Sequence, residues 1–144
     1  MKTDRRGRRG GSALEMALFL PWYVFMFVGA FDWGVYARAL ISVESAARVA
    51  VLYTSSDPSL ADDSAGACAY AYRELVSSPN LSATPLCPAS SLPVIITATR
   101  KVASGADGAD AAEVSVTYQT QQLIPIPGLL PGQITVHRVV QMKL

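Results

Sequence analysis

The sequence places one carboxylate, Glu15, at the start of a long apolar run, where its charge needs a physical explanation. An ionised acid costs about 2–3 kcal/mol when it moves toward the centre of a bilayer. Two interpretations follow. Glu15 either lies at the headgroup level, where an acid suits the positive end of a helix dipole, or it has a charged partner and a function.

Residues suited to conventional catalysis or metal binding are few. The single histidine, His137, lies in a strand-like segment, and no nucleophile elbow, phosphate loop or paired-carboxylate signature is present. One histidine and two cysteines make a poor metal-ligand set. Asp62–Asp63 favours a helix start and Asp107/Asp110 a turn, with calcium at Asp107–Asp110 as an alternative that matches no complete loop motif. We therefore expect no enzymatic activity, no catalytic residue, no metal and no cofactor.

The apolar run is long enough to cross a membrane. Sixteen residues without a charge, Met16 to Phe31, follow Glu15. Ala13 and Leu14 extend the run to about the 20 residues that span a hydrocarbon core. A buried core helix is the alternative, but such helices are usually shorter and carry a polar face. The run predicts a transmembrane helix.

Charge is distributed unevenly along the chain. The first ten residues hold five of the twelve basic residues and one acid, which leaves seven basic and ten acidic residues, a net charge of −3, from Gly11 onward. Positive charge at a short N-terminal end keeps that end cytoplasmic, so everything after Asp32 is predicted to be exported. A basic tail can also bind nucleic acid, but beside a membrane span it more often specifies topology, and we expect no nucleic-acid partner.

Both cysteines, Cys68 and Cys87, lie in the part predicted to be exported. An even number of cysteines in an oxidising compartment favours a disulfide. Two unpaired small core residues are the alternative.

Helical spacing continues beyond the apolar run and predicts one helix over residues 11–54 that spans the membrane in its first half. A second helix is expected to begin at Ser59, with Asp62 three residues later at capping-box spacing. The segment 77–93, rich in Ser and Pro, is expected to be a surface loop.

The C-terminal third changes to a period of two, which predicts strands at Val94–Val102, Glu113–Leu123 and Ile134–Leu144. Short connections favour an antiparallel meander whose apolar face packs on the helices. We therefore expect an α+β fold: a basic cytoplasmic leader (1–10), a long helix (11–54), and an exported domain (55–144) with a second helix and a three-stranded antiparallel sheet.

The segment "RRGGSALEMALFLP", followed by "YARALISVESAARVAVLY", resembles the TadE-like pseudopilins of the tight-adherence (Flp) pilus, within the type IV prepilin class. In that class a leader ending in glycine is cut on the cytoplasmic side, and the fifth residue of the mature chain is Glu. A cut between Gly10 and Gly11 makes Glu15 the fifth mature residue, and a cut after Gly11 makes it the fourth.

The resemblance implies cutting by a prepilin peptidase, followed by a structural role as a minor pseudopilin or assembly subunit. Its implied partners are other pilin or pseudopilin subunits and the pilus assembly platform in the bacterial inner membrane. The C-terminal domain would be periplasmic or extracellular, and both the platform and the filament stay open as destinations. The new N-terminal amine would offer a cation to Glu15 of a neighbouring subunit, so that each charge compensates the other in an apolar environment.

Three other interpretations remain at this point. A secreted domain could follow a signal peptide cut at "ARA", residues Ala37–Ala39. An uncleaved single-span membrane protein could bind a partner through its exported domain. A membrane-tethered enzyme could use His137.

Overall fold

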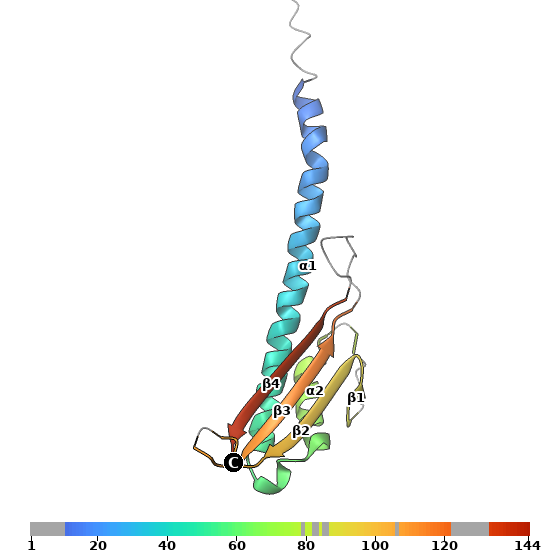
Figure 1. Cartoon of the computed structure of the whole chain (residues 1–144). Helices are drawn as coiled ribbons and strands as arrows, with labels where there is room; N and C mark the ends of the chain where they lie inside the picture. The colour runs from blue at the N-terminus through green and yellow to red at the C-terminus, as the bar shows by residue number, and fades with distance from the viewer. Residues whose placement is uncertain (1–10, 79, 82–83, 85–86, 106, 122–132) are drawn as a thin grey trace, which may run out of the picture. The chain divides into compact units, whose positions relative to one another are not determined.

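The structure is a computed structural model of the whole chain, shown in Figure 1. It describes residues 11–78, 80–81, 84, 87–105, 107–121 and 133–144. The chain divides into two compact units, Met1–Val35 and Tyr36–Leu144. One helix, α1 (Gly11–Thr54), contributes residues to both, and each unit is described by itself.

The described part of the N-terminal unit is the first half of α1. Its large apolar side chains are exposed, and the Trp22 and Phe25 rings stack with centroids 6.5 Å apart. Pro21 lies within the helix, a position that membrane helices tolerate better than water-exposed ones. An 18-residue window of α1 is apolar enough, and the helix long enough, to cross a membrane. The predicted membrane helix is therefore supported as a candidate.

The C-terminal unit combines helices with one antiparallel sheet. The predicted α+β fold is confirmed, but the sheet has four strands in the order β1-β2-β3-β4 rather than three. Besides the second half of α1, its elements are η2 (Pro58–Leu60), α2 (Ser64–Leu75), β1 (Ser90–Ser91), β2 (Val94–Lys101), β3 (Ala111–Gln119) and β4 (Thr135–Lys143).

The extra strand, β1, lies inside the segment predicted to be a loop. Ser90 pairs with Ile95 and Ser91 with Val94, so that Leu92 and Pro93 form the connection of a short hairpin. A strand of two serines has no apolar alternation, which is why its sequence gives no period-two signal.

Alternation fixes which face of the sheet is buried. Val114, Val116 and Tyr118 on β3 are buried, as the period of two predicts. For the third strand, alternation predicts an apolar face formed by Ile134, Val136, Val140 and Met142. This face is only partly buried, because Val136 is buried whereas Met142 is 39% exposed. β4 is the last strand of the sheet, so its side chains have neighbours on one side only.

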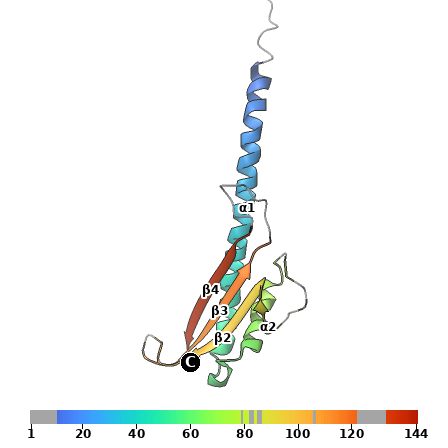
Figure 2. The ribbon, with the colours of Figure 1, turned by 45° about the vertical axis from the view of Figure 1, so that its right-hand side comes forward.

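The C-terminal half of α1 and α2 cover the same face of the sheet (Figures 1 and 2). Ala46, Ala47 and Ala50 of α1 are fully buried, and their small side chains let the helix approach closely. The core contains mostly small and β-branched side chains from both helices and three strands: Val43, Ala46, Ala47, Ala50, Val51, Ala67, Cys68, Ala71, Leu75, Val94, Ile96, Ala98, Ala112, Val114, Val116, Tyr118 and Val136.

The predicted start of the second helix at Ser59 is wrong. Asp57 caps the short η2 turn, and α2 begins only at Ser64. Its N-cap is Asp63, whose Oδ1 accepts a hydrogen bond from the Gly66 N–H at 3.0 Å. Asp62 instead accepts a bond from the backbone N–H of Arg100 at 2.7 Å and so ties the helix start to the sheet.

Gly66→Ala is a first testable prediction, because helix propensity alone predicts a gain in stability and the structure predicts a loss. An alanine usually stabilises a helix interior by about 0.5–1 kcal/mol relative to glycine. A Cβ at Gly66 would overlap the Asp63 carboxylate and the Tyr53 ring, which is stacked on Tyr70 with centroids 4.6 Å apart. We expect Gly66→Ala to lower the free energy of unfolding by about 1–2 kcal/mol.

Urea denaturation of the full chain in detergent measures this effect. The control is Ala69→Gly, at an exposed position of the same helix, which should cost only the propensity difference of about 1 kcal/mol. A gain in stability for Gly66→Ala would contradict the packing described here.

The two cysteines are joined in the structure. Cys68 is fully buried on α2, and Cys87 lies 19 residues later, with the two Cα atoms 5.7 Å apart. The bond holds the Ser/Pro-rich segment against the helix. Closing a loop of this length lowers the conformational entropy of the unfolded chain and stabilises the fold by about 3 kcal/mol.

Reduction should therefore lower the free energy of unfolding of the C-terminal unit by about 3 kcal/mol. Denaturation of the full chain in detergent, with and without a reductant, measures the difference. A chain with both cysteines replaced by alanine serves as the control, because a reductant should not change its stability. Equal stability of the oxidised and reduced wild-type chains would show that the loop adds nothing.

Candidate assembly and processing site

Glu15 lies near the N-terminal end of α1, where the neighbouring side chains of the helix are apolar. Its side chain is exposed, and its neighbours Leu14 and Met16 are 75% and 71% exposed. None of the described residues forms an ion pair with it. A carboxylate in this position has no partner within the described part of its own chain.

The predicted processing residues lie at the start of this helix. Gly10 is outside the described residues, and Gly11 is the first residue of α1. A cut between them would leave a free amine on the first residue of the helix. Gly11 and Glu15 are four residues apart, which places them on the same face with a rise of about 6 Å between them.

The apolar helix surface around Glu15 is not buried by any other described part of the chain. Large apolar side chains are exposed along α1, among them Phe19, Trp22 and Phe27 at 55%, 61% and 74%. A helix that is apolar on all sides is stable only in lipid or among other helices. Both environments also raise the cost of leaving a carboxylate unpaired.

Unlike Glu15, the aspartates at the predicted helix start and turn have structural partners. Asp110 accepts a hydrogen bond from Arg100 Nε at 3.0 Å, which is the main reason that its pKa is lowered. Asp107 forms an ion pair with Lys143 at 3.1 Å, so the two carboxylates of the calcium alternative bind cationic side chains. The pKa of Asp63, the N-cap residue of α2, is lowered mainly by the hydrogen bond that its carboxylate accepts from the Gly66 N–H.

His137 lies on the exposed face of β4. Its Nε2 is 3.3 Å from Ser115 Oγ on the neighbouring strand, and both groups lie outside the core. Within the described ranges, no group of three or more His, Cys, Asp or Glu side chains is arranged to hold a metal ion. Among the described residues, His137 has this serine as a side-chain partner, and none of their carboxylates is hydrogen-bonded to it.

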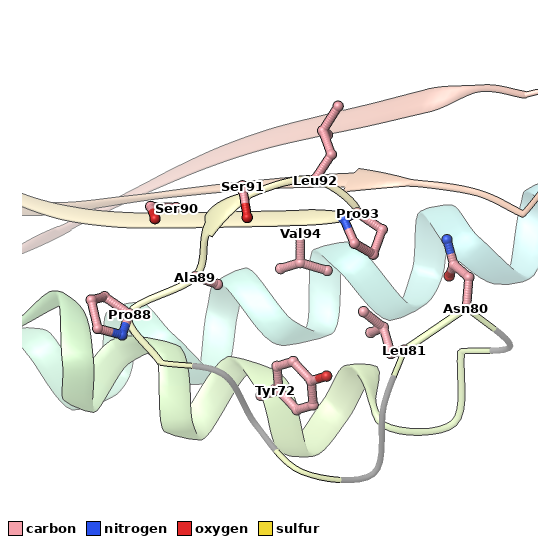
Figure 3. Close-up of a pocket in the computed structure, with 10 residues that line it drawn as sticks. All are labelled: Tyr72, Asn80, Leu81, Pro88, Ala89, Ser90, Ser91, Leu92, Pro93 and Val94. Carbon is pink, nitrogen blue, oxygen red and sulfur yellow. The ribbon is translucent and has the colours of Figure 1, made fainter.

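Sequence analysis missed a pocket of about 370 Å³ between α2 and the β1–β2 hairpin, shown in Figure 3. Tyr72, Leu81 and Val94 line it with apolar surface. Its amide side chain, Asn80, is already engaged, because it donates to the Gln119 carbonyl at 2.6 Å and accepts from the Tyr118 hydroxyl. Its lining residues come from three separate segments between Tyr72 and Val94, and none of these segments carries a binding motif.

Comparison with known proteins supports the N-terminal resemblance. Residues 10–52 match the family model described as TadE-like protein, which confirms the resemblance predicted from the sequence over that segment. The match covers Gly10, Gly11, Glu15 and most of α1, and leaves the sheet outside. No curated protein and no solved structure matches the chain.

Proposed function

From the TadE-like match of residues 10–52, we propose that the chain is a minor pseudopilin or assembly subunit of a tight-adherence pilus, matured by a prepilin peptidase. The match itself suggests a subunit associated with that pilus. The processing and the specific role are the further step that we propose. In this role the protein is a substrate of the peptidase and a structural part, with no catalytic activity of its own.

One observation carries the proposal: Glu15 is the fifth residue after the Gly10–Gly11 junction, at the start of the apolar half of α1. A peptidase cut at that junction would create a cation on the first residue of the same helix. An amine and a carboxylate in an apolar environment compensate each other's loss of hydration. Processing would therefore supply a cation with which Glu15 of a neighbouring subunit can pair.

The continuity of α1 disfavours a signal peptide. The helix runs without a break through Ala37–Ala39, and Leu40 packs against the core immediately after them. A cut at that site would release the apolar half of a helix whose second half is part of the folded unit. A leader of ten residues removes nothing from the described structure.

The charge distribution supports a location. The basic leader favours a cytoplasmic N-terminus, and α1 is a candidate membrane span, so the C-terminal unit would be periplasmic or extracellular. A disulfide in that unit suits an oxidising compartment. The proposed partners are the prepilin peptidase, other pilin or pseudopilin subunits, and the assembly platform in the inner membrane.

N-terminal sequencing and intact mass of the protein recovered from its native membrane test the proposal. A chain that begins at Gly11, shorter by ten residues, is the expected result. A chain that keeps Met1 would support an uncleaved membrane protein instead. A chain shortened by thirty-nine residues, through Ala39, would support a secreted domain.

A further inference from the structure

The outer edge of β4 is a second surface that the described fold leaves unpaired. β4 is the terminal strand of the sheet and pairs with β3 without interruption from Thr135↔Gln119 to Lys143↔Ala111. The opposite edge strand, β1, has only two residues, Ser90–Ser91. Beyond β1, the outward N–H groups of Ala98 and Arg100 on β2 are already bonded to Ser64 and Asp62. Among the described residues, β4 is therefore the edge that can receive another strand along several residues.

Two hydrogen bonds identify which backbone groups of β4 point outward. Thr120 donates its N–H to the Ile134 carbonyl, and Leu144 donates to the Asp110 carbonyl, so even-numbered residues turn their backbone groups toward β3. In an antiparallel pair the alternate residues turn theirs away. Among the described residues, none forms a backbone bond with these outward groups, which belong to Thr135, His137, Val139, Gln141 and Lys143.

Natural proteins usually protect such an edge with proline, a bulge, a short strand or charges. β4 contains no proline and no bulge over its nine residues. Val139, at its middle, is 45% exposed. Its main protection is Arg138, which shares the helix-covered face with the buried Val136 but is itself exposed.

The charge of this edge selects its partner. β4 carries Arg138 and Lys143 and no acidic residue. Lys143 is paired with Asp107, whereas no carboxylate in the described part of the chain forms an ion pair with Arg138. Like charges on adjacent strands are destabilising, so a basic strand is rejected and an acidic one is favoured.

A second copy of this chain does not fit the edge. Parallel pairing in register would place Arg138 beside Arg138 and Lys143 beside Lys143. Antiparallel pairing would reverse one copy relative to the other. In neither orientation would a second β4 offer a carboxylate to Arg138, because β4 contains no acidic residue.

We propose that the outer edge of β4 binds an extended strand of a different exported subunit, which adds a fifth strand to the sheet. The strand places an acidic side chain against Arg138 on one face and an apolar side chain against Val139 on the other. Backbone hydrogen bonds supply the attachment, and the carboxylate supplies the selectivity. This inference rests on the proposed function for the export of the C-terminal unit and of its partner.

Photocrosslinking of the full chain in its native membrane tests the proposal. A photoreactive phenylalanine replaces Gln141 on the outer edge, and a control chain carries it at the exposed Thr97 of the inner strand β2. The expected adduct maps to an acidic, extended segment of another exported protein and is absent from the control. An adduct with a second copy of this chain, or no adduct beyond the control, overturns the proposal.

Two variants of the photoreactive chain separate backbone pairing from general contact. Val139→Pro removes an outward N–H, whereas Val139→Ala keeps it, and proline is tolerated where the N–H of an edge strand faces outward. Proline should lower the adduct yield at least about tenfold relative to alanine, which corresponds to about 1.4 kcal/mol of binding. Equal yields would overturn strand addition.

Arg138→Glu provides an independent check, because it changes an exposed side chain and leaves the bonds to β3 intact. It should reduce the adduct strongly, whereas Arg138→Lys should keep most of it. Equal adduct yields from Arg138→Glu and from the chain that keeps Arg138 would contradict an acidic partner strand. The N-terminus of the same preparations is sequenced, so that a failure of processing is recognised separately from a failure of strand binding.

Discussion

Gly10→Ala is expected to stop maturation, so that the full-length precursor accumulates and the processed chain disappears. Glycine at the scissile position allows a peptidase to approach the backbone where no Cβ intervenes. The matching segment begins at this residue, and α1 begins at the next one. Immunoblotting for precursor and mature chain, followed by N-terminal sequencing, measures the effect.

The leader offers a matched control in Gly7→Ala, which makes the same chemical change three residues earlier and should leave maturation intact. Gly11→Ala distinguishes the two candidate bonds: it should be cut normally if Gly10 is the scissile residue and poorly if Gly11 is. A mature product of normal size from Gly10→Ala would refute the assignment of Gly10.

Secondary structure was predictable wherever the sequence is strongly periodic. Val114, Val116 and Tyr118 alternate with half-buried polar residues, and β3 buries all three. The start of α2 was misplaced because Ser59 and Asp62 satisfy a capping pattern as a sequence, whereas Pro58 and Asp57 form a separate turn there. Capping residues are interchangeable in sequence, and only the three-dimensional path of the chain selects one.

Features that depend on the presence or absence of a neighbouring strand could not be predicted from the pattern of one segment. The serines of β1 become a strand only because β2 offers an edge to them. Met142 follows the alternation of β4, yet it stays 39% exposed because no further strand lies beside it. The candidate site, in contrast, could be predicted from the sequence alone, because it is defined by the spacing from Gly10 to Glu15 along the chain.

The helix α1 can therefore be interpreted from sequence similarity, whereas the sheet has to be interpreted from its three-dimensional structure. The family match ends at residue 52, close to the end of α1 at Thr54. In the proposed function, the helix interacts with a peptidase, a membrane and neighbouring helices, and each of these interactions restricts its residues. The sheet would be restricted only by its own packing and by the proposed partner of its edge. Its function must therefore be inferred from geometry such as the free edge of β4.

Glu15→Ala is expected to leave cutting largely intact and to abolish assembly. Its carboxylate has no ion-pair partner among the described residues, and the surrounding helix surface is apolar. If the new amine of one subunit pairs with Glu15 of another, removing the acid leaves that amine unpaired in an apolar environment. Breaking such a buried pair costs about 3–5 kcal/mol. Counting surface pili by electron microscopy, beside an immunoblot of the mature chain, measures both outcomes.

The conservative variants decide whether charge or shape matters. Glu15→Gln keeps the size of the side chain and removes its charge, so it should fail like alanine, whereas Glu15→Asp should assemble in part. Pairing within one chain is the competing arrangement, since Gly11 and Glu15 share a helix face with a rise of about 6 Å between them. In that case the N-terminal amine and Glu15 of each subunit would already be paired with each other before assembly. Glu15→Ala would then leave the number of pili unchanged. Unchanged piliation would therefore contradict pairing between subunits, even if the peptidase cuts after Gly10 as proposed.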